Sequence, residues 1–110
     1  MLVTATLSSQ LLSYVISPSN SGMADSPNVV HTFIDGWPDG MVVSARGDYW
    51  VALTAADRVD VVDAAGLRID TVALPAGSLP TNVCIGGARA DELFVTAARS
   101  QALLRIRFGR

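Results

Sequence analysis

The chain has 110 residues, half of them hydrophobic, which allows one small domain with a buried core and excludes two. Its formal net charge is −2 without any block of like charge, so neither nucleic acid nor an anionic membrane is expected as a partner. The single cysteine excludes an intrachain disulfide, and no window approaches the roughly 20 apolar residues of a membrane helix. The N-terminal stretch lacks the basic and apolar regions of a signal peptide, so we expect a soluble, cytoplasmic protein.

Short β-prone runs separated by turn residues follow one another along the chain. A loop rich in Ser, Pro, Asn and Gly interrupts them between the second and third runs. No stretch keeps a 3.6-residue period, so the predicted fold class is all-β. The predicted strands cover residues 2–7, 11–16, 29–34, 41–45, 49–54, 58–62, 68–74, 82–85, 92–96 and 103–108.

Three segments repeat one pattern at intervals of roughly 45 residues: LVTATLSSQLLSYVIS, WVALTAADRVDVVDAAG and LFVTAARSQALLRIRFG. Each has an apolar strand ending in small residues, a short polar turn and a second apolar strand. A four-stranded unit of this length is typical of a propeller blade, so the repeats predict a partial β-propeller of about two and a half antiparallel blades. We assign residues 1–34 to the last strands of one blade, 39–75 to a full blade and 80–108 to the first strands of a third.

So few blades cannot close a ring, because propellers need roughly four to eight. Open sheet edges and uncovered apolar faces would remain. The sequence therefore leaves three interpretations open, namely part of a longer protein, an assembly of copies, or strands that pack in another way.

The segments PDGMVVSARGDYWVA, RVDVVDAAGLRIDTVALP and LPTNVCIGGARADELFVTAA resemble the C-terminal part of the gluconolactonase family, also called the senescence marker protein or regucalcin family. The resemblance covers nearly the whole chain and is strongest from Pro38 to Ala97. It implies a six-bladed β-propeller that hydrolyses sugar lactones and related esters with a divalent metal, which could be Ca²⁺, Zn²⁺, Mg²⁺ or Mn²⁺.

Asp39 is the candidate catalytic and metal-binding residue. In the family, a Glu, two Asn and the Asp of a Pro-Asp-Gly-Met motif hold the metal, and this chain has a counterpart only for the last of these. A carboxylate is a hard oxygen ligand and can also accept a proton from water, so the resemblance implies both roles. Pro38 would fix the backbone before Asp39, and Gly40 would allow close backbone approach after it. Without the family context, the same three residues indicate only a turn.

The other polar residues favour structural interpretations. His31 is expected at the surface or at a sheet edge, and Cys84 as a buried, unreactive thiol. Asn82 either faces the propeller channel or hydrogen-bonds at the start of its strand, and Trp37 either walls a substrate cleft or packs on a loop. The turn serines lack a Gly-x-Ser-x-Gly elbow, and the aspartates of the central hairpin are expected on its solvated face. These residues are Ser8, Ser9, Ser100, Asp57, Asp60, Asp63 and Asp70.

Two functions of different classes are predicted. The first is the C-terminal fragment of a gluconolactonase-like, metal-dependent hydrolase, which takes a small lactone as substrate and is not expected to be active as this chain alone. The alternative is a non-catalytic β-sheet module that self-associates through its open blade edges. A propeller-type protein-binding surface is a weaker third interpretation, because aromatic residues make up only 6% of the chain.

Overall fold

The computed structural model describes residues 1–16 and 26–108, and the predicted loop after the second strand falls largely outside these ranges. The described backbone forms ten strands, one for each predicted run, so the all-β prediction is confirmed. The strands are β1 (Leu2–Ala5), β2 (Gln10–Ser13), β3 (Asn28–Thr32), β4 (Pro38–Val43), β5 (Tyr49–Leu53), β6 (Arg58–Val62), β7 (Arg68–Ala73), β8 (Pro80–Gly86), β9 (Glu92–Ala97) and β10 (Ala102–Arg107). A short 3-10 helix, η2 (Thr54–Ala56), follows β5. No helix in the described ranges is long and apolar enough to cross a membrane.

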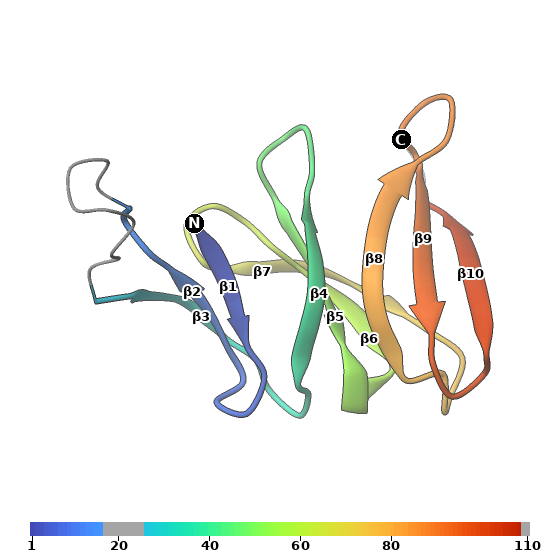
Figure 1. Ribbon diagram of the computed structural model, residues 1–110. Helices are drawn as coiled ribbons and strands as arrows, with labels where there is room; N and C mark the ends of the chain where they lie inside the picture. Colours follow the sequence, from blue (N-terminus) through green and yellow to red (C-terminus); the bar gives the residue numbers. More distant parts are fainter. Residues whose placement is uncertain (17–25, 109–110) are drawn as a thin grey trace.

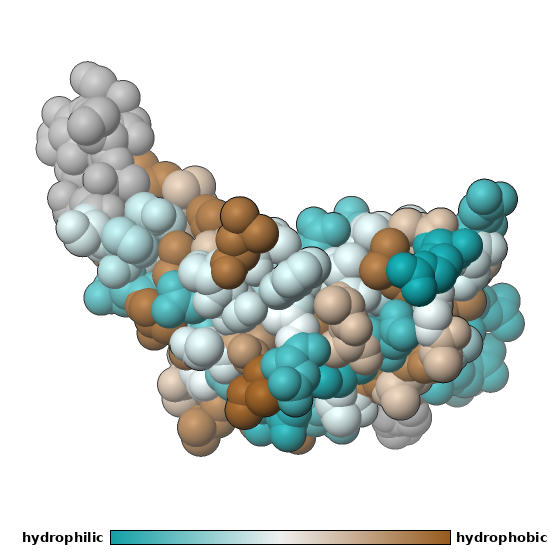
Figure 2. Space-filling view, turned by 90° about the horizontal axis from the view of Figure 1, so that it is seen from below, coloured by the Kyte–Doolittle hydropathy of each residue, from teal (hydrophilic) through white to brown (hydrophobic). Residues whose placement is uncertain are grey.

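The strands form three antiparallel sheets (Figure 1). The first sheet has the order β1-β2-β3, the second β4-β5-β6-β7 and the third β8-β9-β10. Within each sheet, every strand pairs with the strand next to it in the sequence. Seen from below, the surface outlines an arc (Figure 2), and β4 contacts both β1 and β8. Meander sheets stacked along an arc are the arrangement of neighbouring propeller blades.

One turn conformation recurs at the matching position of the three sequence repeats. Ser9, Asp57 and Gln101 each precede the second strand of a repeat, with left-handed φ values of 57°, 50° and 53°. Residues other than glycine adopt this conformation rarely. Its recurrence shows that the repeat in the sequence is also a repeat in the backbone.

The two central strands of the middle sheet, β5 and β6, are buried on both faces. Alternate residues of β5 point to opposite sides of the sheet. One side contributes to a core cluster shared with the first sheet, made of Leu11, Phe33, Val51, Leu53 and Val62. The other side contributes to a cluster shared with the third sheet, made of Trp50, Ala52, Val59, Val61, Leu74, Val83, Leu93 and Val95. The first and third sheets each keep an open face, on which Val29 and Leu103 are 54% and 66% exposed.

Cys84 lies on the open face of the third sheet, so the prediction of a buried thiol is wrong. Its neighbours Val83 and Ile85 belong to the side of β8 that faces the core. The alternation of side chains along a strand therefore turns Cys84 outward, where its thiol is exposed.

Asp60 is buried, which contradicts its predicted place on a solvated face. It lies in the middle of β6 and is 1% exposed. Its Oδ1 accepts hydrogen bonds from Arg58 Nε and from Thr71 Oγ1, both at 2.9 Å. A carboxylate withdrawn from water needs such partners, so these contacts explain how the sheet tolerates a charge inside it.

Candidate functional site around Asp39

Asp39 is the second residue of β4 and lies in a β-bulge. Pro38 pairs with Leu53 and Met41 with Val51, so two residues of β4 lie opposite one residue of β5. Pro38 is fully buried, whereas Asp39 is exposed. A bulge changes the direction in which a side chain leaves its strand, and bulges are frequent beside active sites. The backbone therefore presents a carboxylate to solvent at the start of a strand whose other residues are mostly covered.

The strands β4 and β8 are in close contact beside Asp39. A Cβ atom on Gly40 would come within 2.7 Å of the Asn82 Cα and would overlap the Asn82 side chain. The predicted role of Gly40 in close backbone approach is thus confirmed. Asn82 is exposed, and its Oδ1 accepts a hydrogen bond from the Val83 N–H at 2.9 Å. The Asn82 amide therefore hydrogen-bonds at the start of its strand and also lies next to the residue that follows Asp39.

Three hydroxyl groups, one on β1 and two in the turn that joins β1 to β2, hold the segment that leads into Asp39. Each donates a hydrogen bond to a backbone carbonyl of this segment. The pairs are Thr4 Oγ1 to the Asp39 carbonyl at 2.8 Å, Thr6 Oγ1 to the Pro38 carbonyl at 2.9 Å and Ser9 Oγ to the Gly36 carbonyl at 3.1 Å. We call these three residues the hydroxyl strap. Reasoning from the sequence missed both threonines, which look like ordinary β-prone residues of the first strand.

The described residues supply one carboxylate to this site and not a complete metal shell. In residues 1–16 and 26–108, no three His, Cys, Asp or Glu side chains lie close enough together to hold a metal ion. The Asp39 carboxylate is a hard oxygen donor of the kind that suits Ca²⁺ or Mg²⁺, but these cations take about six oxygen ligands or more. The described residues therefore do not fit a resident divalent metal on their own, and the other ligands would have to come from elsewhere.

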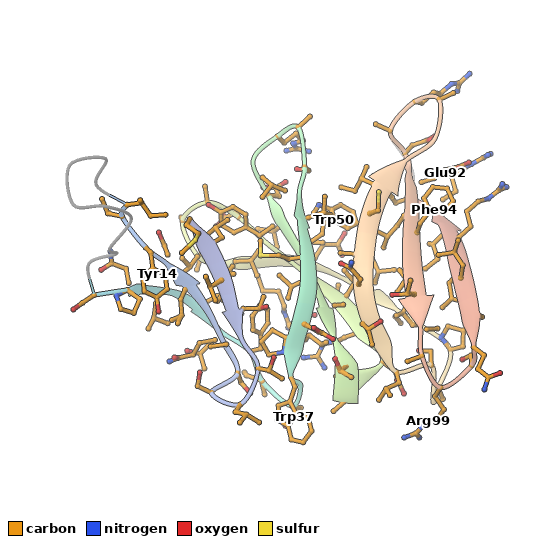
Figure 3. The ribbon with its side chains drawn as sticks, viewed as in Figure 1. Tyr14, Trp37, Trp50, Glu92, Phe94 and Arg99 are labelled. Atoms are coloured by element: carbon orange, nitrogen blue, oxygen red, sulfur yellow. The ribbon has the colours of Figure 1, made fainter. Side chains whose placement is uncertain are left out.

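Trp37 is the aromatic residue nearest to Asp39 in the sequence. It is 52% exposed and lies at the end of the molecule where β4 begins (Figure 3), so half of its surface is open to a ligand. His31 lies on the edge strand β3, half-buried, with Nδ1 2.9 Å from the Gly66 carbonyl, so its predicted surface or edge position is confirmed.

A shallow hollow of about 100 Å³ lies on the open face of the third sheet. Cys84, Phe94 and Leu103 give it an apolar lining, and Asn82 contributes to its rim together with Thr96. The thiol has no basic partner among these lining residues that could activate it as a nucleophile. The hollow is therefore an uncovered sheet face and not a second catalytic site.

Asp57 holds the connection between β7 and β8, which joins the second sheet to the third. Its carboxylate accepts hydrogen bonds from the Leu79 N–H at 2.9 Å and the Gly77 N–H at 2.7 Å. These bonds hold the pKa of Asp57 below its ordinary value of 3.8, and the bond from Leu79 has a larger effect than the bond from Gly77. Partial burial acts in the opposite direction and raises this pKa. Arg99 and Ser78 lower this pKa further. The Asp57 carboxylate therefore has a structural role, because its oxygens accept the hydrogen bonds that hold this connection.

One family model, described as the SMP-30/Gluconolactonase/LRE-like region, matches residues 1–99. The chain belongs to this family. The family and the partial β-propeller that the motifs and repeats predicted are thus confirmed.

Regucalcin from Homo sapiens is 43% identical to this chain over 63 residues, which cover 56% of this chain and 21% of regucalcin. The chain thus spans about a fifth of the length of the curated relatives it matches. Among solved structures, a luciferin-regenerating enzyme superposes with a TM-score of 0.77 at 25% identity, over 93% of this chain and 34% of that enzyme. A calcium-binding protein, regucalcin from Agrobacterium tumefaciens, superposes with a TM-score of 0.74 over 98% of this chain and 41% of that regucalcin chain. The two sequences are 24% identical, so this likeness shows the fold alone.

Proposed function

We propose that this chain forms the C-terminal part of a metal-dependent hydrolase that opens sugar lactones or related esters. The observation that carries the proposal is Asp39, an exposed carboxylate in a bulge at the start of β4, at the position where the family resemblance implies a metal ligand. Membership of a family that includes gluconolactonases supports the reaction class.

The proposal gives separate roles to this chain and to the residues that would complete the site. In the completed protein, Asp39 would hold a divalent cation together with ligands from other blades, and such a cation would supply Lewis-acid chemistry. The Asp39 carboxylate would also accept a proton from the attacking water. We assign the exposed Asn82 amide, which lies beside Gly40, a role in hydrogen-bonding the substrate.

The test is hydrolysis of glucono-δ-lactone, followed through acid release with Ca²⁺, Zn²⁺, Mg²⁺ or Mn²⁺, by a protein in which this chain is joined to the remaining blades. Asp39→Asn keeps the size of the side chain and removes its charge, so it should lower kcat/KM by at least about 10²-fold. Asp70→Asn changes an exposed aspartate on β7 and is the matched control, which should keep its activity. An Asp39→Asn protein with full activity would overturn the proposal.

A second candidate function is a non-catalytic module that self-associates through the open faces of its outer sheets. The specific observation in its favour is the apolar hollow on the third sheet, next to a Leu103 side chain that is 66% exposed. Light scattering on the purified chain would detect dimers or larger species. A monomer across the micromolar range would exclude this function.

A cytoplasmic location is also part of the proposal, carried over from the sequence. Fractionation of cells that express the tagged protein would test it, and recovery outside the cytoplasmic fraction would contradict it.

A further inference from the structure

A pocket of about 240 Å³ lies between the second and third sheets, at the end of β4 opposite to Asp39. The β4–β5 turn and the β8–β9 turn border it, and both turns lie at the same end of the molecule (Figure 1). We call it the arginine pocket. None of its lining residues belongs to residues 36–40, so an inference about this pocket does not rest on the function proposed above. The side chains that matter for the argument are Ser44, Arg46, Trp50, Ile85, Arg89 and Phe108.

The Trp50 indole N–H is a buried donor that the described residues leave without an acceptor. The side chain is 8% exposed and lies between the second and third sheets (Figure 3), in the core cluster that joins them. Its Nε1 atom is withdrawn from water, and no hydrogen-bond partner for it lies within residues 1–16 and 26–108. A buried polar group in this state loses its hydration without compensation. Such groups are rare and call for a water, an ion or a ligand as partner.

The repeat of the fold does not require an indole at this position. Seven positions before the left-handed turn residue of each repeat stand Leu2, Trp50 and Phe94. Leu2 and Phe94 have hydrocarbon side chains and no donor to satisfy. The N–H group of Trp50 is therefore not demanded by the backbone repeat, which leaves it for a partner in the pocket that Trp50 lines.

The polar side chains of the arginine pocket can all donate hydrogen bonds, and none of the described side chains that line it is a carboxylate. Arg46 and Arg89 lie on exposed turns, and the ion pairs between described residues involve other arginines. Ser44 Oγ accepts a hydrogen bond from the Asp48 N–H at 3.2 Å, so its own hydrogen remains available for donation. A ligand that satisfies this set of groups must supply acceptors and negative charge.

A second hollow, of about 250 Å³, shares Arg46 and Trp50 with the arginine pocket. Its lining also includes Asp48 and Asp70, whose carboxylates repel an anion. An anionic group is therefore favoured on the side of the arginine pocket and not in the second hollow.

The rest of the arginine pocket is apolar. Phe108 packs on Trp50 with the ring centroids 4.7 Å apart, and Ile85 lines the pocket from β8. A cavity of about 150 Å³ holds benzene, so the larger volume of the arginine pocket accommodates one ring with a carboxylate. Guanidinium groups bind carboxylates through paired N–H donors. A singly charged carboxylate also loses less hydration than a doubly charged phosphate when it enters a pocket with apolar walls.

We propose that the arginine pocket binds a small carboxylate with an aromatic or branched apolar body. The two guanidinium groups hold the carboxylate, the apolar wall contacts the body, and the Trp50 N–H donates to the ligand. Sugar acids, the products of the reaction proposed above, do not suit this pocket, because their hydroxyl groups would lie against apolar side chains.

The experiment titrates the ¹⁵N-labelled chain with sodium benzoate at constant ionic strength and follows the two indole N–H signals. Trp37→Phe assigns them, because it removes one of the two tryptophans. The Trp50 signal should shift and saturate at millimolar benzoate, as expected for so small a ligand. The Trp37 side chain is 52% exposed and lies at the other end of β4 (Figure 3), so its signal is the internal reference and should not move.

Arg46→Gln and Arg89→Gln should each raise the benzoate concentration at half-saturation about tenfold, the effect of one lost hydrogen bond to a charged group. Arg105→Gln is the matched control and should leave this concentration unchanged. It makes the same change in net charge at an exposed position of β10 outside the pocket lining. Benzamide keeps the ring without the charge, and gluconate keeps the charge without the ring. Neither should shift the Trp50 signal.

The proposal is overturned if benzoate leaves the Trp50 signal in place, or if benzamide or gluconate shifts it at the same concentrations. It is also overturned if either pocket variant binds benzoate like the wild-type chain. A Trp50 signal that moves on dilution of the chain alone would show that a second copy fills the pocket, which equally overturns the proposal. If a variant at Arg46 or Arg89 does not fold, the comparison of benzoate with benzamide and gluconate on the wild-type chain decides.

Discussion

Removal of the buried Asp60 carboxylate should destabilise the protein more than any surface change. In Asp60→Ala, Arg58 Nε and Thr71 Oγ1 both lose their partner at 2.9 Å. The Arg58 side chain is only 21% exposed, so water replaces the lost carboxylate poorly. The same guanidinium donates from Nη2 to the Ile34 carbonyl at 2.6 Å, and the change therefore also loosens the connection from β3 to β4.

The expected loss in the free energy of unfolding is about 3–5 kcal/mol, the cost of breaking a buried ion pair by removal of one partner. Two hydrogen bonds to a charged group, at about 1.5–3 kcal/mol each, give a similar figure. A domain of this size has a total stability of about 5–15 kcal/mol, so Asp60→Ala would remove a large part of it. Asp60→Leu combined with Arg58→Met should lose less than Asp60→Ala alone, because the uncompensated guanidinium is also removed.

Urea unfolding, followed by circular dichroism and analysed by linear extrapolation, measures these differences. Asp70→Ala is the control, since Asp70 is exposed on β7, and it should change the stability by no more than about 0.5 kcal/mol. The reasoning is refuted if Asp60→Ala is as stable as Asp70→Ala, or if the double variant is less stable than Asp60→Ala.

Three further predictions concern single positions. Gly40→Ala should lower the free energy of unfolding, measured in urea, by about 1–3 kcal/mol, because its Cβ would meet the Asn82 backbone. Adding Asn82→Ala should recover only part of this loss. Full stability in Gly40→Ala would contradict the close approach of β4 and β8. Because the pKa of Asp57 is lowered, its contribution to stability is present above pH 3.8 and is lost as the pH falls through its folded-state pKa. The difference in free energy of unfolding between the wild-type chain and Asp57→Asn should therefore shrink toward acid pH. A difference that stays constant with pH would contradict the lowered pKa. Cys84 should react with a thiol reagent in the absence of urea, and protection of the native thiol would show that the open face of the third sheet is covered.

The strands could be predicted because their signals are local. Turn residues mark where each strand stops, and the Pro-Asp-Gly-Met motif marks the start of β4 within a few positions. The direction of individual side chains could not be predicted in the same way, since it depends on which faces of a sheet are covered. Asp60 alternates with valines on β6, which on a half-exposed strand would place it in water. The strand β6 is covered on both faces, so the Asp60 side of β6 meets the first sheet instead.

For Cys84, too, the direction of the side chain could not be predicted, but here the residue expected to be buried is exposed. Its run is apolar, which indicates a strand buried on both sides. The third sheet has only one neighbour among the described residues, so one side of β8 is open. The hydroxyl strap was hidden for a different reason, because its bonds join residues 27 to 35 positions apart and no local pattern reports them.

The bulge that holds Asp39 has a counterpart one sheet further along. In β8, Pro80 pairs with Ala97 and Asn82 with Thr96, so Thr81 takes the place that Asp39 occupies in β4. A bulged residue stands outside the regular pairing of its strand, and its identity can change without a shift of register. The architecture therefore repeats a position where chemistry can be gained or lost by a single substitution while the scaffold stays intact. Asp39 and Thr81 are thus different residues at equivalent bulge positions of two neighbouring sheets.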